Sequence, residues 1–307
     1  MTWHLVTTEF APRLNGIATW SVAMANALHN AGESVVVHVR SPSGDFPFLV
    51  VPMRGRSWRS WSGVWAAASV RPRRRDGDVV VCATWPLAVH LPGPILVAWH
   101  GSELSCAAQA PGREAVIARA RNLPVSNFLG SLLHADHTVL PFPIVPTKRA
   151  IPGDDLLVVS RLNHRKGVDR ALRLAQRLRR RIRIVGDGPE RSTLVALAEN
   201  IGVDAVFLGE TRDIPWDGTR ALLLLSRAEA DGSGAEGLGL VLLEAAARGI
   251  PTVGTRVGGI PEAASVVLDD PDQDDLPTLP GADAVQAWLA DHHGPARTLA
   301  VLRHNAV

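Results

Sequence analysis

The chain has 307 residues, of which 46% are hydrophobic and 20% are charged, and a formal net charge of +2. This balance excludes disordered, collagen-like and disulfide-stapled chains, and at roughly 150 residues per domain it predicts two domains. The two cysteines, Cys82 and Cys106, lack the spacing of metal ligands, and we find no leader sequence and no uncharged apolar run of about 18 residues. We therefore expect a soluble protein of the cytoplasm.

Charge is divided unevenly between the two halves of the chain. Residues 1–150 contain 14 Lys and Arg against 8 Asp and Glu, whereas residues 151–307 contain 18 against 22. The basic excess of the first half indicates an anionic partner or a membrane surface for that half, or arginines on solvated faces. Both interpretations stay open at this point.

Short apolar runs alternate with amphipathic stretches along the first half. The runs predict buried strands at 2–7, 34–39, 78–83 and 94–99. Residues 17–32 have apolar positions at helical spacing and end at Gly32, a residue favoured after helix C-termini.

The second half repeats this alternation after a Pro-rich linker predicted at 141–155. The apolar runs there predict strands at 155–160, 181–186, 205–209, 221–226 and 251–255, with helices at 168–180 and 240–249. Strand–helix alternation in both halves is typical of two parallel α/β domains. Ligands of such domains bind at the carboxyl ends of the strands, so we expect the site in a cleft between the domains.

Two cations lie in the loop that follows the first strand of the second half. In SRLNHRKG (160–167), Arg161 and Lys166 flank a short turn, and Gly167 allows a close approach of backbone to a ligand. An arginine fork and a lysine point charge beside a helix N-terminus suit a diphosphate. The alternative is two solvated surface cations.

Two glutamates mark the segment 232–262. Glu236 and Glu244 are eight residues apart, with Gly237 and Gly239 between them and an apolar helix after the glycines. Amides at a helix start suit a phosphate or a sugar hydroxyl, and the carboxylates can accept hydrogen bonds from sugar and ribose hydroxyls.

These segments resemble glycosyltransferase family 4, a family of retaining enzymes, and the chain looks like a compact bacterial member. Residues 236–244 follow E-G-L-G-x-V-L-L-E, and residues 249–262 follow G-I-P-x-V-x-T-x-V-G-G-I-P-E. SRLNHRKG resembles the family's R-x4-K-G donor clamp, and IVGDGPE (184–190) resembles its strand-end G-x-G-P. APRLNGIATW (11–20) and AWHGSE (98–103) resemble its N-terminal glycine loop and the segment with its cleft histidine.

The resemblance implies an α/β GT-B fold with two Rossmann-like domains that face a central cleft. Residues 1–147 would form the N-terminal acceptor-binding domain and residues 148–307 the C-terminal domain for a nucleotide-sugar donor. The sequence is short for the family, and no clear final helix returns to the first domain.

The resemblance also assigns roles to single residues. Arg161 and Lys166 would bind the donor diphosphate and stabilise it as it leaves, and Glu244 would hold the ribose. Glu236, with the amides of Gly237, Leu238 and Gly239, would hold the donor sugar and the distal phosphate. The remaining roles fall in the first domain, where Gly16 would approach that phosphate and His100 would lie beside the reacting centre.

Two positions depart from the family pattern. Asn15 replaces the first glycine of the usual pair, which would narrow the space beside the phosphate, and Leu238 replaces the usual phenylalanine. We therefore keep Asn15 among the donor-binding candidates, and we count His100, Arg161, Lys166 and Glu236 as the catalytic candidates.

The chemistry implied by the resemblance is retaining transfer from a UDP- or GDP-sugar to a hydroxyl of a glycan, lipid or natural product. In front-face attack the leaving phosphate accepts the acceptor's proton, so neither a protein nucleophile nor a metal is expected. The alternatives are a non-catalytic nucleotide-sugar-binding pseudoenzyme and a GT-B nucleotide-sugar epimerase. A nicotinamide dehydrogenase is disfavoured because Arg191 replaces the last glycine of G-x-G-x-x-G.

Weaker signals remain. Trp58, Trp61 and Trp65 lie at helical spacing within the basic segment 56–75, which fits a core face, an acceptor platform or peripheral contact with the inner membrane face. We interpret His134 and His137, and the acidic run 269–275, as surface features and not as metal sites. No basic stripe with interleaved aromatic residues predicts nucleic-acid binding.

Overall fold

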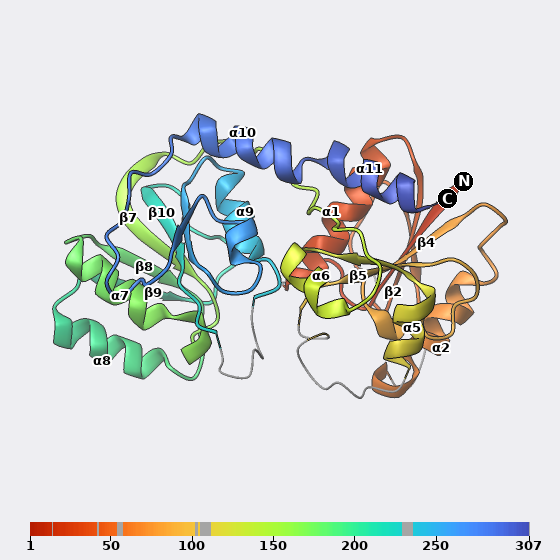
Figure 1. Cartoon of the computed structure of the whole chain (residues 1–307), viewed down its shortest axis with the longest axis horizontal. Coiled ribbons are helices and arrows are strands. Elements are labelled where there is room, and N and C mark those ends of the chain that lie inside the picture. The colour runs from red at the N-terminus through yellow and green to blue at the C-terminus, as the bar shows by residue number, and fades with distance from the viewer. Residues whose placement is uncertain are drawn as a thin grey trace. The chain divides into compact units, whose positions relative to one another are not determined.

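The computed structural model describes the chain except for residues 14, 42, 54–57, 102–103, 105–111, 229–235 and 307, and for 58–63 it describes the backbone alone. The chain forms two compact units (Figure 1). The first unit comprises Met1–Pro143 and His293–Val307, and the second comprises Ile144–His292.

The first unit contains a six-stranded parallel sheet in the order β3-β2-β1-β4-β5-β6. The strands are β1 (Thr2–Thr7), β2 (Ser34–Val39), β3 (Leu49–Pro52), β4 (Val79–Cys82), β5 (Leu96–Trp99) and β6 (Arg121–Pro124). The helices are α1 (Gly16–Asn30), α2 (Trp58–Val70), α3 (Trp85–Ala88), α5 (Arg113–Arg119), α6 (Asn127–Leu133) and α11 (Pro295–Asn305). Every residue of β4 and β5 is buried, as expected for strands covered on both faces.

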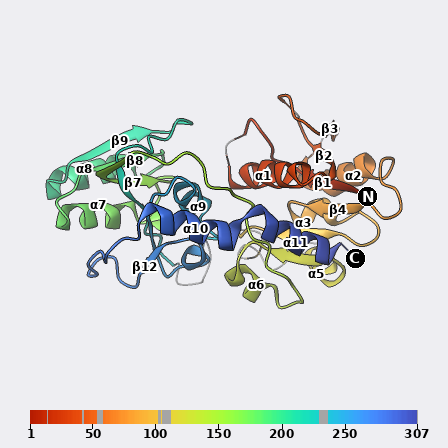
Figure 2. The same cartoon turned by 90° about the horizontal axis from the view of Figure 1, so that it is seen from above.

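The second unit contains a parallel sheet in the order β12-β11-β10-β7-β8-β9. The strands are β7 (Pro152–Val159), β8 (Ile182–Val185), β9 (Ala205–Gly209), β10 (Thr219–Leu224), β11 (Thr252–Thr255) and β12 (Val266–Leu268). The α-helices are α7 (Val168–Arg177), α8 (Arg191–Ile201), α9 (Leu240–Ala246) and α10 (Ala282–His293). Helices α7 and α8 lie beside β7, β8 and β9 (Figure 2).

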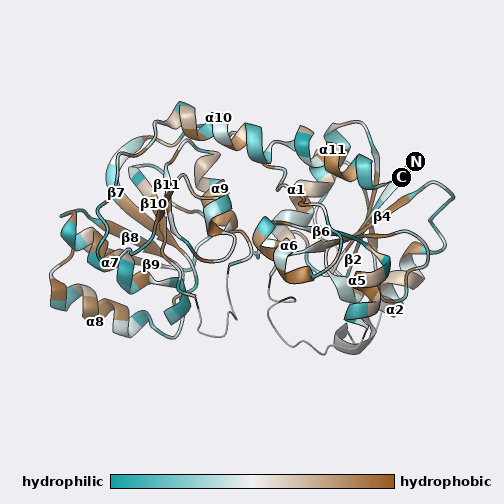
Figure 3. Cartoon of the chain, in the orientation of Figure 1, coloured by the Kyte–Doolittle hydropathy of each residue, from teal (hydrophilic) through white to brown (hydrophobic). Residues whose placement is uncertain are grey.

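Hydropathy follows this layering. In Figure 3 the strands are drawn mostly in the hydrophobic colour, whereas the helices alternate between hydrophilic and hydrophobic residues. Apolar residues of β7, β8 and β10 form one buried core with α7 and α8, for example Leu156, Ile184 and Leu223. The helices therefore turn their apolar stripes towards the sheet.

Both sheets have the same doubly wound strand order. The order reverses between β1 and β4 in the first unit and between β7 and β10 in the second. The prediction of two Rossmann-like parallel α/β units is confirmed. Ligands of this architecture bind beyond the carboxyl ends of the strands at the reversal, so a ligand site is expected at that edge of each sheet.

The predicted strands all form, but the sequence analysis missed three others. Strands β3, β6 and β12 have only three or four residues, and β6 reads Arg-Asn-Leu-Pro, which has no apolar alternation. The predicted linker 141–155 is too long, because its last residues already belong to β7.

The domain limits also differ from those predicted. The first unit ends at Pro143 instead of residue 147, and residues 293–307 group with it and not with the second unit. Helix α11 is a final helix that returns to the first unit, contrary to the prediction. It buries Leu299 and Leu302, and the Thr298 hydroxyl donates to the Pro141 carbonyl at 2.9 Å.

No helix among the described residues has both the length and the apolar character to cross a bilayer.

Candidate functional site

The second unit brings two predicted site residues together at the reversal of its strand order. Lys166 lies in the loop after β7, and Glu236 lies in the segment between β10 and α9. Strands β7 and β10 are parallel neighbours, so the segments that leave them emerge at the same edge of the sheet. Residues 70 positions apart in the sequence can therefore touch.

The Lys166 loop is held by local hydrogen bonds and a close backbone contact. The side chain of Asn163 caps the short 3-10 helix His164–Lys166 by accepting from the Lys166 amide at 3.3 Å. Gly167 follows with φ 63°, and a Cβ at this position would collide with the carbonyl oxygen of Leu225. Glycine is required here because the loop must pack against the end of β10.

Lys166 and Glu236 form an ion pair. The Lys166 ammonium donates to Glu236 Oε1, and the Ser226 hydroxyl donates to the same oxygen at 3.4 Å. The side chains are 25% and 18% exposed, so both charged groups remain accessible to a ligand. One molecule carrying phosphate and hydroxyl groups could pair with the cation and the carboxylate at once.

Backbone contacts hold the Glu236 segment from the other side. The Gly259 amide donates to the Glu236 carbonyl at 2.9 Å, and the Thr255 hydroxyl donates to the Ser226 carbonyl at 2.7 Å. Thr255 is the last residue of β11 and Gly259 follows that strand, so both donors belong to the G-I-P…G-G-I-P-E stretch. This stretch therefore has a structural role in positioning the carboxylate.

A second ion pair, which the sequence analysis missed, braces the same loop. The Arg227 guanidinium donates to both carboxylate oxygens of Asp169, at 2.7 and 2.6 Å, and to the His164 carbonyl at 3.1 Å. Burial opposes ionisation of Asp169, but hydrogen bonding and charge from Arg227 outweigh it and lower the pKa of the carboxyl group. Arg227 directly follows the predicted strand 221–226. Its position at the carboxyl end of a strand was the sequence signal that could have identified it as a site residue.

Arg161 is a second cation of the loop that follows β7. Its side chain is exposed, and no carboxylate among the described residues pairs with it. The G-D-G stretch packs under its loop: the Leu162 amide donates to the Asp187 carbonyl at 2.9 Å, and a Cβ at Gly188 would collide with the Leu162 carbonyl. Close packing against the neighbouring loop therefore accounts for the glycines of G-D-G, and a dinucleotide-binding role is not needed to explain them.

Glu244 occupies the middle of α9, after the Leu238–Gly239 start of that helix. Leu238 is buried, and Gly239 has φ 84° at the helix N-cap. Glu244 is half-buried, and burial raises the pKa of its carboxyl group, opposed by the positive charge of Arg248. A carboxylate short of solvent gains from hydroxyl donors supplied by a ligand. Among the described residues, no hydrogen bond or ion pair joins the Glu244 carboxylate to Lys166 or Glu236.

The first unit places its predicted residues around the start of α1. Asn15 is the N-cap: its Oδ1 accepts from the Ala18 amide at 2.9 Å, and its Nδ2 donates to Glu9 at 3.3 Å. Gly16 is the exposed first residue of α1. One turn later the Trp20 ring meets His100 edge to face, with centroids 4.8 Å apart. Asn15 thus caps the helix in the place of the family's first glycine.

The other candidates have ordinary structural surroundings. Trp65 packs against the core of the first unit, which supports the core interpretation for this residue, whereas the side chains of Trp58 and Trp61 lie outside the described residues. His137 packs against Gly130, and its Nδ1 pairs with the Ala135 carbonyl at 2.9 Å. Within the described ranges, no three His, Cys, Asp or Glu residues are grouped to hold a metal ion.

The acidic run 269–275 is bound by arginines. Arg177 donates to the carbonyls of Pro271, Asp272 and Asp274, and Arg170 pairs with the Asp272 carboxylate at 3.2 Å. The loop is therefore tied to α7 through these contacts.

Comparison with protein families and curated proteins gives matches concentrated in the second unit. Residues 147–266 match the model of the glycosyl transferases group 1. A GDP-mannose-dependent alpha-(1-6)-phosphatidylinositol monomannoside mannosyltransferase of Mycolicibacterium smegmatis is 38% identical over 174 residues, which cover 50% of this chain and 44% of that protein. N-acetyl-alpha-D-glucosaminyl L-malate synthase of Bacillus anthracis is 46% identical over 81 residues, covering 26% and 20%. The chain thus aligns with less than half the length of these relatives.

Solved structures resemble nearly the whole chain. AviGT4, a glycosyltransferase involved in avilamycin A biosynthesis, has a TM-score of 0.78 at 19% identity, covering 99% of this chain and 96% of that one. Anabaena Alr3699/HepE in complex with UDP and glucose has a TM-score of 0.71 at 14% identity, covering 98% of both chains. At such identities the likeness shows the fold, and the predicted GT-B fold is confirmed.

Proposed function

We infer that this chain, whose residues 147–266 match the model of the glycosyl transferases group 1, moves a sugar from a nucleoside-diphosphate sugar to a hydroxyl acceptor. The observation that carries this proposal is the Lys166–Glu236 pair at the reversal of strand order in the second sheet. A diphosphate and a sugar present the two chemistries that this pair can bind.

The reaction needs stabilisation of the leaving group above all. Breaking the anomeric C–O bond builds negative charge on the diphosphate, and preorganised cations at that position lower the barrier. In the proposal, Lys166 and the exposed Arg161 supply this charge, while Glu236 exchanges its bond to Lys166 for sugar hydroxyls. Asp169 and Arg227 hold the loop in place and act as positioning residues.

We extend the proposal to a retaining reaction that needs no metal. Two cations beside the diphosphate would supply the charge that a divalent ion supplies elsewhere, and the departing phosphate would accept the acceptor's proton. Retention through front-face attack rests on the resemblance to glycosyltransferase family 4.

The remaining site residues complete this proposal. Glu244 would accept hydrogen bonds from the ribose hydroxyls, and the amides of Gly237, Leu238 and Gly239 would face the donor sugar and distal phosphate. From the first unit, Asn15 and Gly16 would approach the phosphate and His100 the reacting sugar, and the same unit would bind the acceptor. The mycobacterial relative's name makes GDP-mannose one donor to test, and the HepE complex makes UDP-sugars another.

Contact with the cytoplasmic face of a membrane is a separate part of the proposal. It is supported by the exposed Arg71, Arg73 and Arg75, which end the basic segment 56–75. Co-sedimentation with anionic but not neutral vesicles would support membrane contact. A protein that sediments with neither kind of vesicle would contradict it.

The proposal is tested by donor binding. Thermal shifts with UDP, GDP, ADP, dTDP and NAD should single out one nucleoside diphosphate, and at 100 times its dissociation constant it should stabilise the fold by about 2.7 kcal/mol. Lys166→Ala and Arg161→Ala should each lose most of this shift. Lys148 is the other lysine of the chain and is exposed, so Lys148→Ala is the matched control.

Activity separates transfer from mere binding. Release of the nucleoside diphosphate from the matching nucleotide sugar, with or without added acceptor, should be slow but measurable in the wild type and lost in Lys166→Ala. Stabilisation by NAD alone, or by none of the nucleotides, would refute the donor site. Tight donor binding without any release would instead favour the pseudoenzyme.

A further inference from the structure

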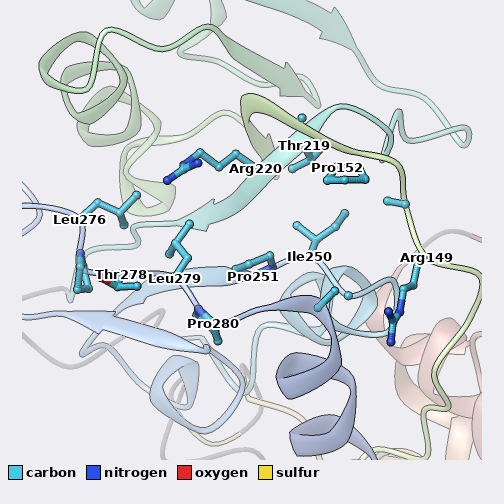
Figure 4. A pocket seen from close by; sticks show the side chains of 15 residues that line it. Arg149, Pro152, Thr219, Arg220, Ile250, Pro251, Leu276, Thr278, Leu279 and Pro280 are labelled. Atoms are coloured by element: carbon cyan, nitrogen blue, oxygen red, sulfur yellow. The ribbon is translucent and has the colours of Figure 1, made fainter.

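A cavity of about 750 Å³ lies in the second unit at the edge where its strands begin. Pro152 and Gly153 at the start of β7, Thr219 and Arg220 at the start of β10, and Pro251 before β11 line it (Figure 4). The Lys166–Glu236 pair follows the ends of β7 and β10. Because these strands are parallel, the cavity lies at the opposite edge of the sheet from that pair.

The cavity has the size and walls of a small-molecule site. Its volume falls within the range of about 300–1,000 Å³ that is typical of such sites. Most of the apolar residues that line it come from two loops, 249–251 and 276–280. Prolines at 152, 251, 277 and 280 restrict the backbone, so the walls are largely preformed.

The charge of the lining is one-sided. Arg149 and Arg220 line the cavity, and none of the lining residues is acidic. Arg149 is already engaged, because it pairs with Asp283 and donates to the Gln286 side chain at 2.9 Å. Arg220 is exposed at the start of β10, and within the described part of the chain no carboxylate pairs with it. An arginine left open beside apolar walls favours a ligand with an oxyanion and a hydrocarbon part.

The cavity also touches both segments by which the chain enters and leaves the second unit. Arg149 and Ala150 belong to the entering segment, and Ala282 begins α10, which leads out. The two segments are joined: besides the Arg149–Asp283 pair, Gln286 donates to the carbonyls of Thr147 and Ala247 at 3.3 and 2.8 Å. A ligand in the cavity would therefore rest on both connections at once.

We propose that this cavity is a binding site for a small amphipathic anion, that is, an oxyanion carried on a short hydrocarbon chain. The oxyanion pairs with the Arg220 guanidinium, and the hydrocarbon part covers Ile250, Pro251 and Leu279. The site is separate from the proposed donor site and does not depend on glycosyl transfer.

Octanoate is the probe, and isothermal titration calorimetry is the measurement. Wild-type protein should bind octanoate more tightly than acetate, which lacks the chain, and more tightly than octanol, which lacks the charge. Arg220→Gln should weaken octanoate binding by about tenfold or more, since a charged hydrogen-bonded pair is lost, and Arg220→Lys should recover part of it. Arg212→Gln is the matched control, because Arg212 is exposed in the same unit and does not line the cavity.

Two results would overturn the proposal: equal octanoate binding by the wild type and Arg220→Gln, or binding of octanol as tight as that of octanoate. Both variants replace an exposed side chain, and unchanged melting temperatures would exclude a folding defect. Lys166→Ala should bind octanoate normally, so failure of the donor site and failure of this site give different results.

Discussion

The charged residues of the candidate site differ in whether a neighbouring residue of opposite charge neutralises them. Lys166 and Glu236 neutralise each other while remaining partly exposed, and Asp169 is compensated by a bidentate arginine. Glu244 differs, because burial raises the pKa of its carboxyl group and none of the described residues donates a hydrogen bond to its carboxylate. A buried carboxylate that lacks hydrogen-bond donors lowers the stability of the free protein, and such groups are typical of sites where a bound ligand supplies the donors.

Glu244→Gln should therefore stabilise the protein while weakening donor binding. The folded state prefers the protonated carboxyl, so the stability contributed by Glu244 is greatest below its unfolded pKa and is lost as pH rises through its folded pKa. At pH 8 the amide should raise the free energy of unfolding by roughly 0.5–1 kcal/mol, and the gain should vanish in acid. Urea unfolding at pH 8 and pH 4 measures both.

The matched control is Glu199→Gln, an exposed glutamate on α8, which should change neither stability nor donor binding. A loss of stability at pH 8 in Glu244→Gln, or unchanged affinity for the nucleoside diphosphate, would contradict the ligand role of Glu244.

Sequence reasoning reached Lys166 and Glu236 because their spacing to strands and glycines is regular. It did not reach Asp169, Ser226 or Arg227, whose roles depend on hydrogen bonds between the β7 and β10 loops. Such partners are distant in the sequence, and each residue type is common on any surface.

At the scale of secondary-structure elements, a buried polar chain joins β1, β2 and α2 to the residue before β4. The Ser69 hydroxyl pairs with His38 Nδ1 at 2.8 Å, His38 Nε2 with His4 Nδ1 at 3.0 Å, and His4 Nε2 with Asp78 at 3.4 Å. One arrangement satisfies every atom: each donor faces the next acceptor from Ser69 to Asp78, with both imidazoles neutral. Asp78 also accepts from the amides of Thr2 and Arg75.

This buried series of hydrogen-bonded side chains should make the first unit sensitive to acid. Burial, together with the charges of His4 and Arg73, lowers the pKa of His38 to about 3, and burial lowers that of His4 despite Asp78. In the unfolded chain both histidines take up protons near pH 6.5. Their contribution to the stability of the folded state is therefore fully present above that pH and is lost as the pH falls. His38 alone should cost about 2 kcal/mol of unfolding free energy between pH 6.5 and 5.

Urea unfolding followed by tryptophan fluorescence checks this, because Trp3, Trp20 and Trp99 are buried in the first unit. His38→Gln should be less stable at pH 7.5 but should show a flatter loss between pH 6.5 and 5. His90→Gln, at an exposed histidine, should leave the slope unchanged. The same slope in His38→Gln and the wild type would contradict the assignment.

The elements themselves were predictable where apolar runs are long. Strands β1, β2 and β9 have the predicted limits, because polar residues or glycine bound the mainly apolar run of each strand. Strands β3, β6 and β12 are short edge or near-edge strands that gain their structure from a neighbour, and their own residues carry little signal.

At the scale of the whole molecule, the C-terminal residues 293–307 belong to the unit that contains the N-terminus. Helix α11 packs on the first unit: Leu302 is fully buried, Leu299 nearly so, and Arg303 pairs with Glu33 at 2.6 Å. The Arg303 hydrogen bond lowers the pKa of Glu33, whose side chain is 17% exposed, whereas that of Arg303 is 51% exposed. The first unit is therefore completed only after the second has been synthesised.

Leu302→Ala should destabilise the first unit by about 2–4 kcal/mol, since it removes a fully buried side chain and leaves a cavity. Arg303→Ala should cost about 1 kcal/mol, because an ion pair whose arginine is half exposed to solvent contributes little. Chemical unfolding of the two variants beside the wild type makes the comparison. Equal costs would mean that α11 is held by its surface charges and not by its apolar face.

The sequence by itself determined the two parallel α/β units, most of their strands, and the loops that carry Arg161, Lys166 and Glu236. These depend on local patterns, in which apolar periodicity, glycines and charges at strand ends act over a few residues. Tertiary structure alone decided the Lys166–Glu236 contact, the bracing by Asp169 and Arg227, the buried histidine chain and the unit to which α11 belongs. Each of these joins segments far apart in the chain, and such pairings depend on how whole sheets and helices pack.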